Sequence, residues 1–112
     1  MDKVEGYRNI IRDILLSLTE RRYANAEVTN EAVFDEGRDR YLVISAGWEG
    51  KTRRIYHSLV HLDIIGGKVW IQRDGTEDGG GYELEAAGIP KLDIVPAFHP
   101  ENVRPHTGYA IA

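Results

Sequence analysis

Cysteine is absent from the 112 residues, and methionine occurs only once. Without cysteine the chain cannot form a disulfide, a zinc–thiolate cluster or a cysteine nucleophile. Long apolar runs are also missing, since no stretch approaches the ~20 residues that a membrane-spanning helix needs. The opening segment is charged, which predicts that no secretory signal is present. Together these absences lead us to expect a cytoplasmic protein with no membrane contact.

An excess of positive charge is missing as well, because the formal net charge is −4. A protein that binds DNA alone usually carries a basic face, since Lys and Arg replace the phosphate counterions. The basic residues here are scattered, apart from short clusters at 21–22 and 51–54. We therefore expect DNA to be reached only indirectly. Direct binding through Lys51, Arg53 and Arg54, with a strongly salt-dependent affinity, remains an alternative.

Hydrophobic periodicity predicts one α+β domain over residues 1–112. The first segment repeats apolar residues at steps of three and four, and Asp2 and Glu5 stand where an N-terminal cap is expected. The period then changes to two, with short turns between strands, which predicts an antiparallel meander covered by the helix. The predicted elements are a helix at 2–22, strands at 27–34, 41–48, about 53–65 and 68–74, a short helix at 82–87, and a C-terminal extended segment.

The glycine pair Gly66–Gly67 predicts a tight hairpin, because glycine adopts positive φ at little cost. A two-residue loop fixes the register of the flanking strands by counting outwards. The predicted pairs are Ile65 with Lys68, Ile64 with Val69, Asp63 with Trp70, Leu62 with Ile71, and His61 with Gln72.

This register predicts a mixed surface on the side of the hairpin away from the Leu62 and Ile64 core. Tryptophan and aliphatic side chains are costly to leave in water, and aromatic anchors are enriched at interfaces. The surface is thus either a contact site for a partner or a second copy, or a face covered by the C-terminal tail or a helix. Its predicted members are Leu59, His61, Asp63, Trp70 and Gln72, with Tyr41 and Val43 beside them.

A metal site is the alternative interpretation of the same strand. His57, His61 and Asp63 would alternate onto one face about 7 Å apart, and His99 or His106 would have to add a ligand. Such a site would make the protein a small metal-dependent enzyme or nuclease component, with Asp74 nearby. The nuclease signal is incomplete, because the strand "VWIQRD" lacks an acid-x-Lys triplet.

Residues 74–85 match the spacing of a calcium loop, although a strand pattern precedes them where the motif requires a helix. The matching residues are Asp74, Thr76, Asp78, Gly79 and Glu85. The chain has no G-x-S-x-G elbow, P-loop or G-x-G-x-x-G motif, so we expect no catalytic residues and no cofactor.

Several long segments resemble the XisI family, the fdxN element excision controlling factors of cyanobacteria. They are "MDKVEGYRNII", "VFDEGRDRYLVISAGW", "RIYHSLVHLDIIGGKVWIQRDGTED", "ELEAAGIPKLDIV", "AFHP" and "TGYAIA". The chain departs from the family pattern at Gly79–Gly80–Gly81, where bulkier residues are expected. Glycine weakens a helix by ~1 kcal/mol relative to alanine, so the departure weakens the start of the second helix.

The resemblance implies a role in the programmed, site-specific excision of a DNA element during heterocyst differentiation. In that system a separate recombinase performs the strand chemistry, and a second controlling factor, XisH, acts beside XisI. The resemblance therefore implies a non-enzymatic regulatory factor that works through protein partners, and a homodimer is a further expectation.

Overall fold

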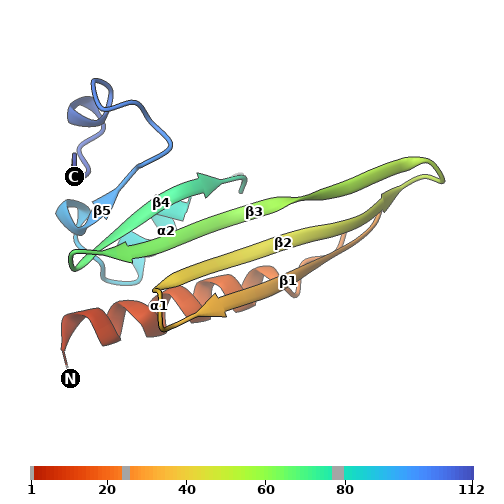
Figure 1. Cartoon of the computed structure of the whole chain (residues 1–112), viewed down its shortest axis with the longest axis horizontal. Coiled ribbons are helices and arrows are strands. Elements are labelled where there is room, and N and C mark those ends of the chain that lie inside the picture. The colour runs from red at the N-terminus through yellow and green to blue at the C-terminus, as the bar shows by residue number, and fades with distance from the viewer. Residues whose placement is uncertain (1, 24–25, 77–79) are drawn as a thin grey trace.

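The computed structural model describes residues 2–23, 26–76 and 80–112 and confirms the α+β prediction (Figure 1). Five strands form one open sheet in the order β1-β2-β3-β4-β5. The first four pair antiparallel as predicted, and the short β5, which lies in the predicted C-terminal extended segment, pairs parallel to β4. The elements are α1 (Lys3–Leu18), β1 (Glu27–Asp35), β2 (Arg40–Glu49), β3 (Arg53–Ile65), β4 (Lys68–Asp74), α2 (Gly80–Ala86), η1 (Lys91–Asp93), β5 (Ile94–Val95) and η2 (Arg104–His106).

Helix α1 begins where the sequence predicts and ends four residues earlier. The Asp2 side chain accepts a hydrogen bond from the Glu5 N–H at 2.8 Å, which satisfies a free donor of the first turn. At the other end, the Thr19 N–H and hydroxyl both bond the Leu16 carbonyl, at 3.1 and 2.6 Å, and close the helix in a tight turn. The predicted continuation to residue 22 is therefore wrong.

The helices cover one face of the sheet and build the core there. The α1 residues that face the sheet are Tyr7, Ile11, Leu15 and Leu18, and α2 adds Leu84. Tyr41 and Val43 of β2 belong to this core and have no exposed surface. Their predicted place on the uncovered face is wrong, because Tyr41 pairs with Leu62 and so shares the core side of the sheet.

An ion pair fixes the β1–β2 turn to α1. The Arg8 guanidinium donates to both carboxylate oxygens of Asp39, at 2.8 and 3.1 Å, and the Tyr41 hydroxyl donates to the same carboxylate at 2.9 Å. The hydrogen bond from Arg8 is the main cause that lowers the pKa of Asp39, and burial raises the pKa of Tyr41. Asp39 itself has a φ of 53°, the left-handed conformation that this turn requires.

The β3–β4 hairpin confirms four of the five predicted pairs. Gly66 and Gly67 have φ values of 59° and 77°, and the pairing from Ile65 with Lys68 to Leu62 with Ile71 is as expected. The fifth pair is wrong: His61 lies opposite Arg73. A bulge leaves Gln72 as an extra residue in β4.

A second bulge, in β3, changes which side chains face the helices. Val60 lies opposite Val43, but Ser58 already lies opposite Ile44, so Leu59 is the extra residue. Leu59 and Val60 are both buried in the core cluster. Alternation is therefore interrupted, and residues before the bulge face the opposite side from the one that simple counting predicts.

The C-terminal segment, residues 96–112, packs against the sheet, which is one of the two alternatives that the sequence leaves open. The Phe98 N–H donates to the Ile71 carbonyl at 3.2 Å, and Lys68 Nζ lies 2.6 Å from the Ala112 carbonyl. The Arg104 guanidinium lies 5.8 Å from the centre of the Trp70 ring. The segment thus packs along the β4 and β5 edge of the sheet (Figure 1), and Arg104 covers Trp70 on the face opposite α1.

Candidate functional site

The sheet face opposite α1 stays largely uncovered, and we call it the open sheet face. Residues that pair directly across antiparallel strands share a face, so the register identifies its members. Its large, strongly exposed members include Tyr56 at 68%, Val33 and Ile65 at 50% and Trp48 at 45%. The open sheet face includes Glu27, Thr29, Glu31, Val33, Leu42, Ile44, Ala46, Trp48, Arg54, Tyr56, Ser58, His61, Asp63, Ile65 and Trp70, and Gln72 joins it through its hydrogen bond to Asp63.

Four of the five predicted contact residues lie together at the end of this face next to the β3–β4 turn, which we call the near end. The far end lies next to the β2–β3 turn at residues 50–52. His61 Nε2 lies 2.8 Å from one oxygen of Asp63, and Gln72 Nε2 donates to the other at 3.3 Å. Asp63 is 5% exposed, so these two hydrogen bonds satisfy a buried carboxylate. The imidazole and the amide, not the carboxylate, are the groups that a partner can reach.

Trp70 and Leu59 depart from the predicted surface in different ways. Trp70 lies on the open sheet face but is partly covered by Arg104, and its indole N–H is buried with no hydrogen-bond partner among the described residues. Leu59 is wrong as a surface residue, because the bulge turns its side chain into the core. The sequence left two alternatives for this face, a contact site or a surface covered by the C-terminal tail. Each applies to a different part, because the C-terminal segment covers part of Trp70 and leaves the rest of the face open.

The far end of the open sheet face holds an aromatic cluster that the sequence reasoning missed. The Arg54 guanidinium lies 5.3 Å from the Trp48 ring centre and 5.8 Å from that of Tyr56. Cation–π contacts of this kind hold the three side chains in one group. The sequence contains a signal for this cluster. If the strand pairing is counted outwards from the turn at residues 50–52, Glu49 lies opposite Arg53 and Trp48 lies opposite Arg54.

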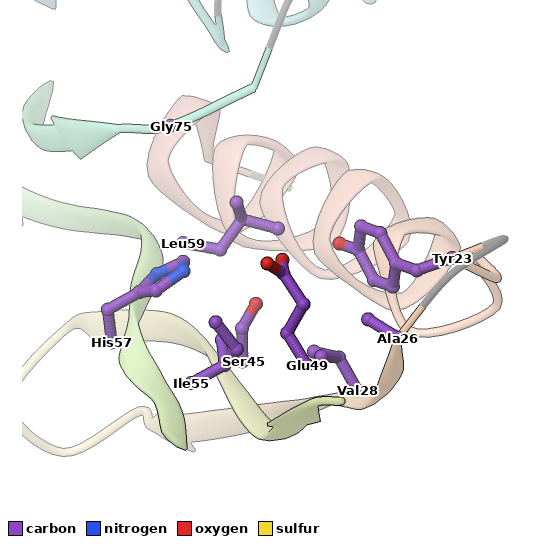
Figure 2. Close-up of a pocket in the computed structure, with 9 residues that line it drawn as sticks. All are labelled: Tyr23, Ala26, Val28, Ser45, Glu49, Ile55, His57, Leu59 and Gly75. Carbon is purple, nitrogen blue, oxygen red and sulfur yellow. The ribbon is translucent and has the colours of Figure 1, made fainter. Parts of the chain in front are cut away.

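A cavity of about 260 Å³ lies on the other side of the same hairpin, beyond the end of α1 (Figure 2). Ser45 donates to Asn30 at 2.6 Å, and Asn30 donates to the Leu18 carbonyl at 2.9 Å and to the Tyr23 hydroxyl at 3.0 Å. This network bonds the last turn of α1 to β1 and β2, so its polar groups already have partners. The cavity is lined by Tyr23, Ala26, Val28, Ser45, Glu49, Ile55, His57, Leu59 and Gly75.

The predicted metal ligands do not meet. His57 lines the cavity on the helix side of the sheet, whereas His61 and Asp63 lie on the open sheet face, because the bulge at Leu59 separates them. Within residues 2–23, 26–76 and 80–112, no three His, Asp or Glu side chains gather as a metal site would require, His99 and His106 included.

The described residues also lack the helix that should precede a calcium loop of this type. A strand, β4, precedes the loop, and Asp74 accepts hydrogen bonds from the N–H and hydroxyl of Thr76, at 3.0 and 2.6 Å. Glu85 lies on α2 and accepts from the Tyr109 hydroxyl at 3.1 Å. Asp78 and Gly79 lie outside the described residues.

The basic cluster at the hairpin tip is largely engaged within the chain. Arg53 pairs with Glu49 at 3.2 Å, and Arg54 stacks on the two aromatic rings. Lys51 is exposed in the turn.

Among the described residues, no helix is long and apolar enough to span a membrane.

Comparisons with known proteins point to one family. The family model described as "XisI protein" matches residues 1–111. A crystal structure of "fdxN element excision controlling factor XisI" from Anabaena variabilis ATCC 29413 is 36% identical, with a TM-score of 0.82, and the match covers 99% of this chain and 100% of that one. A XisI-like protein from the same organism is 27% identical with a TM-score of 0.83, at the same coverage. No curated protein sequence matches.

Proposed function

The chain belongs to the XisI family, and from this premise we propose that it controls the site-specific excision of a DNA element. The observation that carries the proposal is the similarity, along nearly the whole chain, to a protein whose printed name is fdxN element excision controlling factor. In this proposal the protein works in the cytoplasm, on an element that is removed during heterocyst differentiation.

The proposed mechanism is accessory rather than enzymatic. A recombinase breaks and rejoins the DNA strands, and this protein acts by binding an XisH-like controlling factor. The support is the uncovered sheet face, which presents aliphatic, aromatic and hydrogen-bonding groups together, as interfaces do. The net charge of −4 favours contact with DNA through the partner rather than directly.

The proposed partner contact lies at the end of the open sheet face next to the β3–β4 turn, on His61, Gln72 and the uncovered edge of Trp70, with Asp63 buried beneath them. The Asp63 carboxylate holds the His61 ring and the Gln72 amide in place through its two hydrogen bonds. Groups that are held in position before binding lose little conformational entropy when a partner arrives. Leu59 is left out of this contact because it lies in the core.

The experiment that tests this function measures the affinity of the protein for its XisH-like partner. The variant His61→Gln keeps a hydrogen-bonding group for Asp63 and removes the imidazole. His106→Gln is the matched control, because His106 is exposed in η2, in the C-terminal segment. We expect His61→Gln to weaken binding by about tenfold, the scale of an interface anchor, and His106→Gln to bind like the wild type. A wild-type protein with no measurable affinity for the partner would refute the proposed mechanism.

A further inference from the structure

The far end of the open sheet face carries charge in separate columns. On β1 the open side presents Glu27, Thr29 and Glu31, and these lie directly opposite Trp48, Ala46 and Ile44 of β2. The next column, on β3, presents Arg54, Tyr56 and Ser58 opposite the same three β2 residues. Across the sheet, the face therefore reads acidic, then apolar, then basic and aromatic.

This pattern is complementary to itself. We propose that the far end of the open sheet face binds a second copy of the chain, about a two-fold axis that runs parallel to the strands and over β2. The inference goes beyond the proposed function and does not depend on it, because it concerns the chain alone.

The charges select the direction of the axis. A two-fold axis parallel to the strands exchanges the β1 and β3 columns, so Glu27 of each copy lies across from Arg54 of the other. An axis perpendicular to the strands would instead place the acidic β1 column against itself, and like charges facing each other are unfavourable. Packed sheets lie about 10 Å apart, a gap that an extended glutamate and an extended arginine span together.

The apolar column supplies the centre of the proposed interface. With the axis over β2, Trp48, Ala46 and Ile44 each pack against the same residue of the second copy. Aromatic residues at the centre and charged pairs at the edge are the usual arrangement of an interface. The C-terminal segment lies at the opposite end of the face, where Arg104 covers Trp70, so the proposed interface is centred on the end that this segment leaves uncovered.

Nucleic acid is the rival occupant, since Trp48, Tyr56 and Arg54 are residue types on which bases stack. The surrounding charges favour a protein instead. Glu27 lies two strands from Arg54 in the same row, and Arg53 is paired with Glu49 at 3.2 Å. An acidic column beside the aromatic cluster repels phosphates, whereas it attracts the arginine of a second copy.

The size of the surface predicts a weak dimer. Three strands and about seven residues along each give a patch of roughly 15 by 25 Å. This is smaller than the ~800 Å² per partner of a standard interface. We therefore expect a dissociation constant between about 1 µM and about 1 mM. Sedimentation velocity over that concentration range measures it on the whole chain.

Charge reversal tests the proposed pairing. Glu27→Arg alone and Arg54→Glu alone each place like charges across the axis, so each should raise the dissociation constant at least tenfold. The double variant reverses both partners and should restore dimerisation. The controls Glu20→Arg and Arg22→Glu make the same charge changes on exposed residues after α1 and should behave like the wild type. Tyr56→Ser, at a side chain 68% exposed, should weaken the dimer without a change of charge.

Three results would overturn the inference. The first is a wild-type protein that remains monomeric up to about 1 mM. The second is a dimer that neither single reversal weakens, or a double variant that folds like the wild type and fails to associate. The third is wild-type binding to a single-stranded oligonucleotide that Arg54→Glu abolishes without a dimer being present. A monomer that still binds the XisH-like partner would refute this inference and leave the proposed function standing.

Discussion

Truncation of Leu59 tests the bulge that arranges both faces of the sheet. The Leu59 side chain is 7% exposed and packs in the core cluster. Buried Leu→Ala changes cost about 2 to 5 kcal/mol, and the cost increases with the cavity that is left. Leu59 already borders the cavity of about 260 Å³, so its side chain lacks contacts on one side. We therefore expect Leu59→Ala to lower the free energy of unfolding by about 2 to 3 kcal/mol.

The assay is thermal and urea unfolding followed by circular dichroism. For a chain of this length the expected loss corresponds to a fall in Tm of roughly 8 to 12 °C. The control is Val33→Ala on the open sheet face, where the side chain is 50% exposed and the loss should stay below about 1 kcal/mol. If β3 had no bulge, Leu59 would lie on that same face, and the two variants would be equally mild. Equal effects would therefore refute the register.

Three further predictions concern the packing around the core. Asp39→Asn should cost about 1 kcal/mol at neutral pH, because Arg8 loses a charged partner. The pKa of Asp39 is lowered from 3.8, so the stability that its ionised carboxylate adds is present above pH 3.8 and is lost as the pH falls through the lower pKa of the folded state. The free energy of unfolding of the variant should therefore fall less steeply with pH in acid than that of the wild type. Burial and a hydrogen bond to Asp93 raise the pKa of Tyr7 to about 12, so an ultraviolet titration should show this tyrosine ionising well above the ordinary pKa of 10.0. The stability that the protonated Tyr7 adds below pH 10.0 should be lost as the pH rises through about 12. Gly47→Ala should disrupt the β1–β2 pairing and lower Tm, because a Cβ there would lie 1.9 Å from the Glu27 carbonyl oxygen; a Tm equal to that of the wild type would contradict the pairing.

Much of the fold follows from local signals in the sequence. The cap at Asp2 and the apolar stripe of α1 locate the first helix, and the glycine pair at 66–67 sets the β3–β4 register for four consecutive pairs. These signals are reliable because each depends on a few neighbouring residues: a backbone donor and its acceptor, or a turn that only glycine adopts at low cost.

The candidate site could be predicted only in part, because each bulge adds a residue to one strand and shifts the alternation of side chains between the two faces. His61 and Asp63 lie after the β3 bulge and face the side that the 66–67 turn predicts, whereas Leu59, in the bulge, and His57, before it, face the other side. Nothing in the local sequence requires an extra residue at Leu59. Its position depends on packing: with the bulge, Leu59 and Val60 both enter the core under the helices.

The far aromatic cluster was missed for a related reason. Trp48 shares one side of β2 with Leu42, Ile44 and Ala46, an apolar pattern that is typical of a core face, yet the core side of β2 is the one with Tyr41, Val43 and Ser45. Which of the two faces the helix covers is a property of tertiary packing, and the alternation alone is symmetric.

The measurement that tests the central claim most directly is the mass, by light scattering after size exclusion, of this protein co-expressed with the proposed XisH-like partner. The account predicts one mixed species whose mass contains both chains. Two separate peaks, with this protein at the mass it shows alone, would contradict the claim that it controls excision through a protein partner.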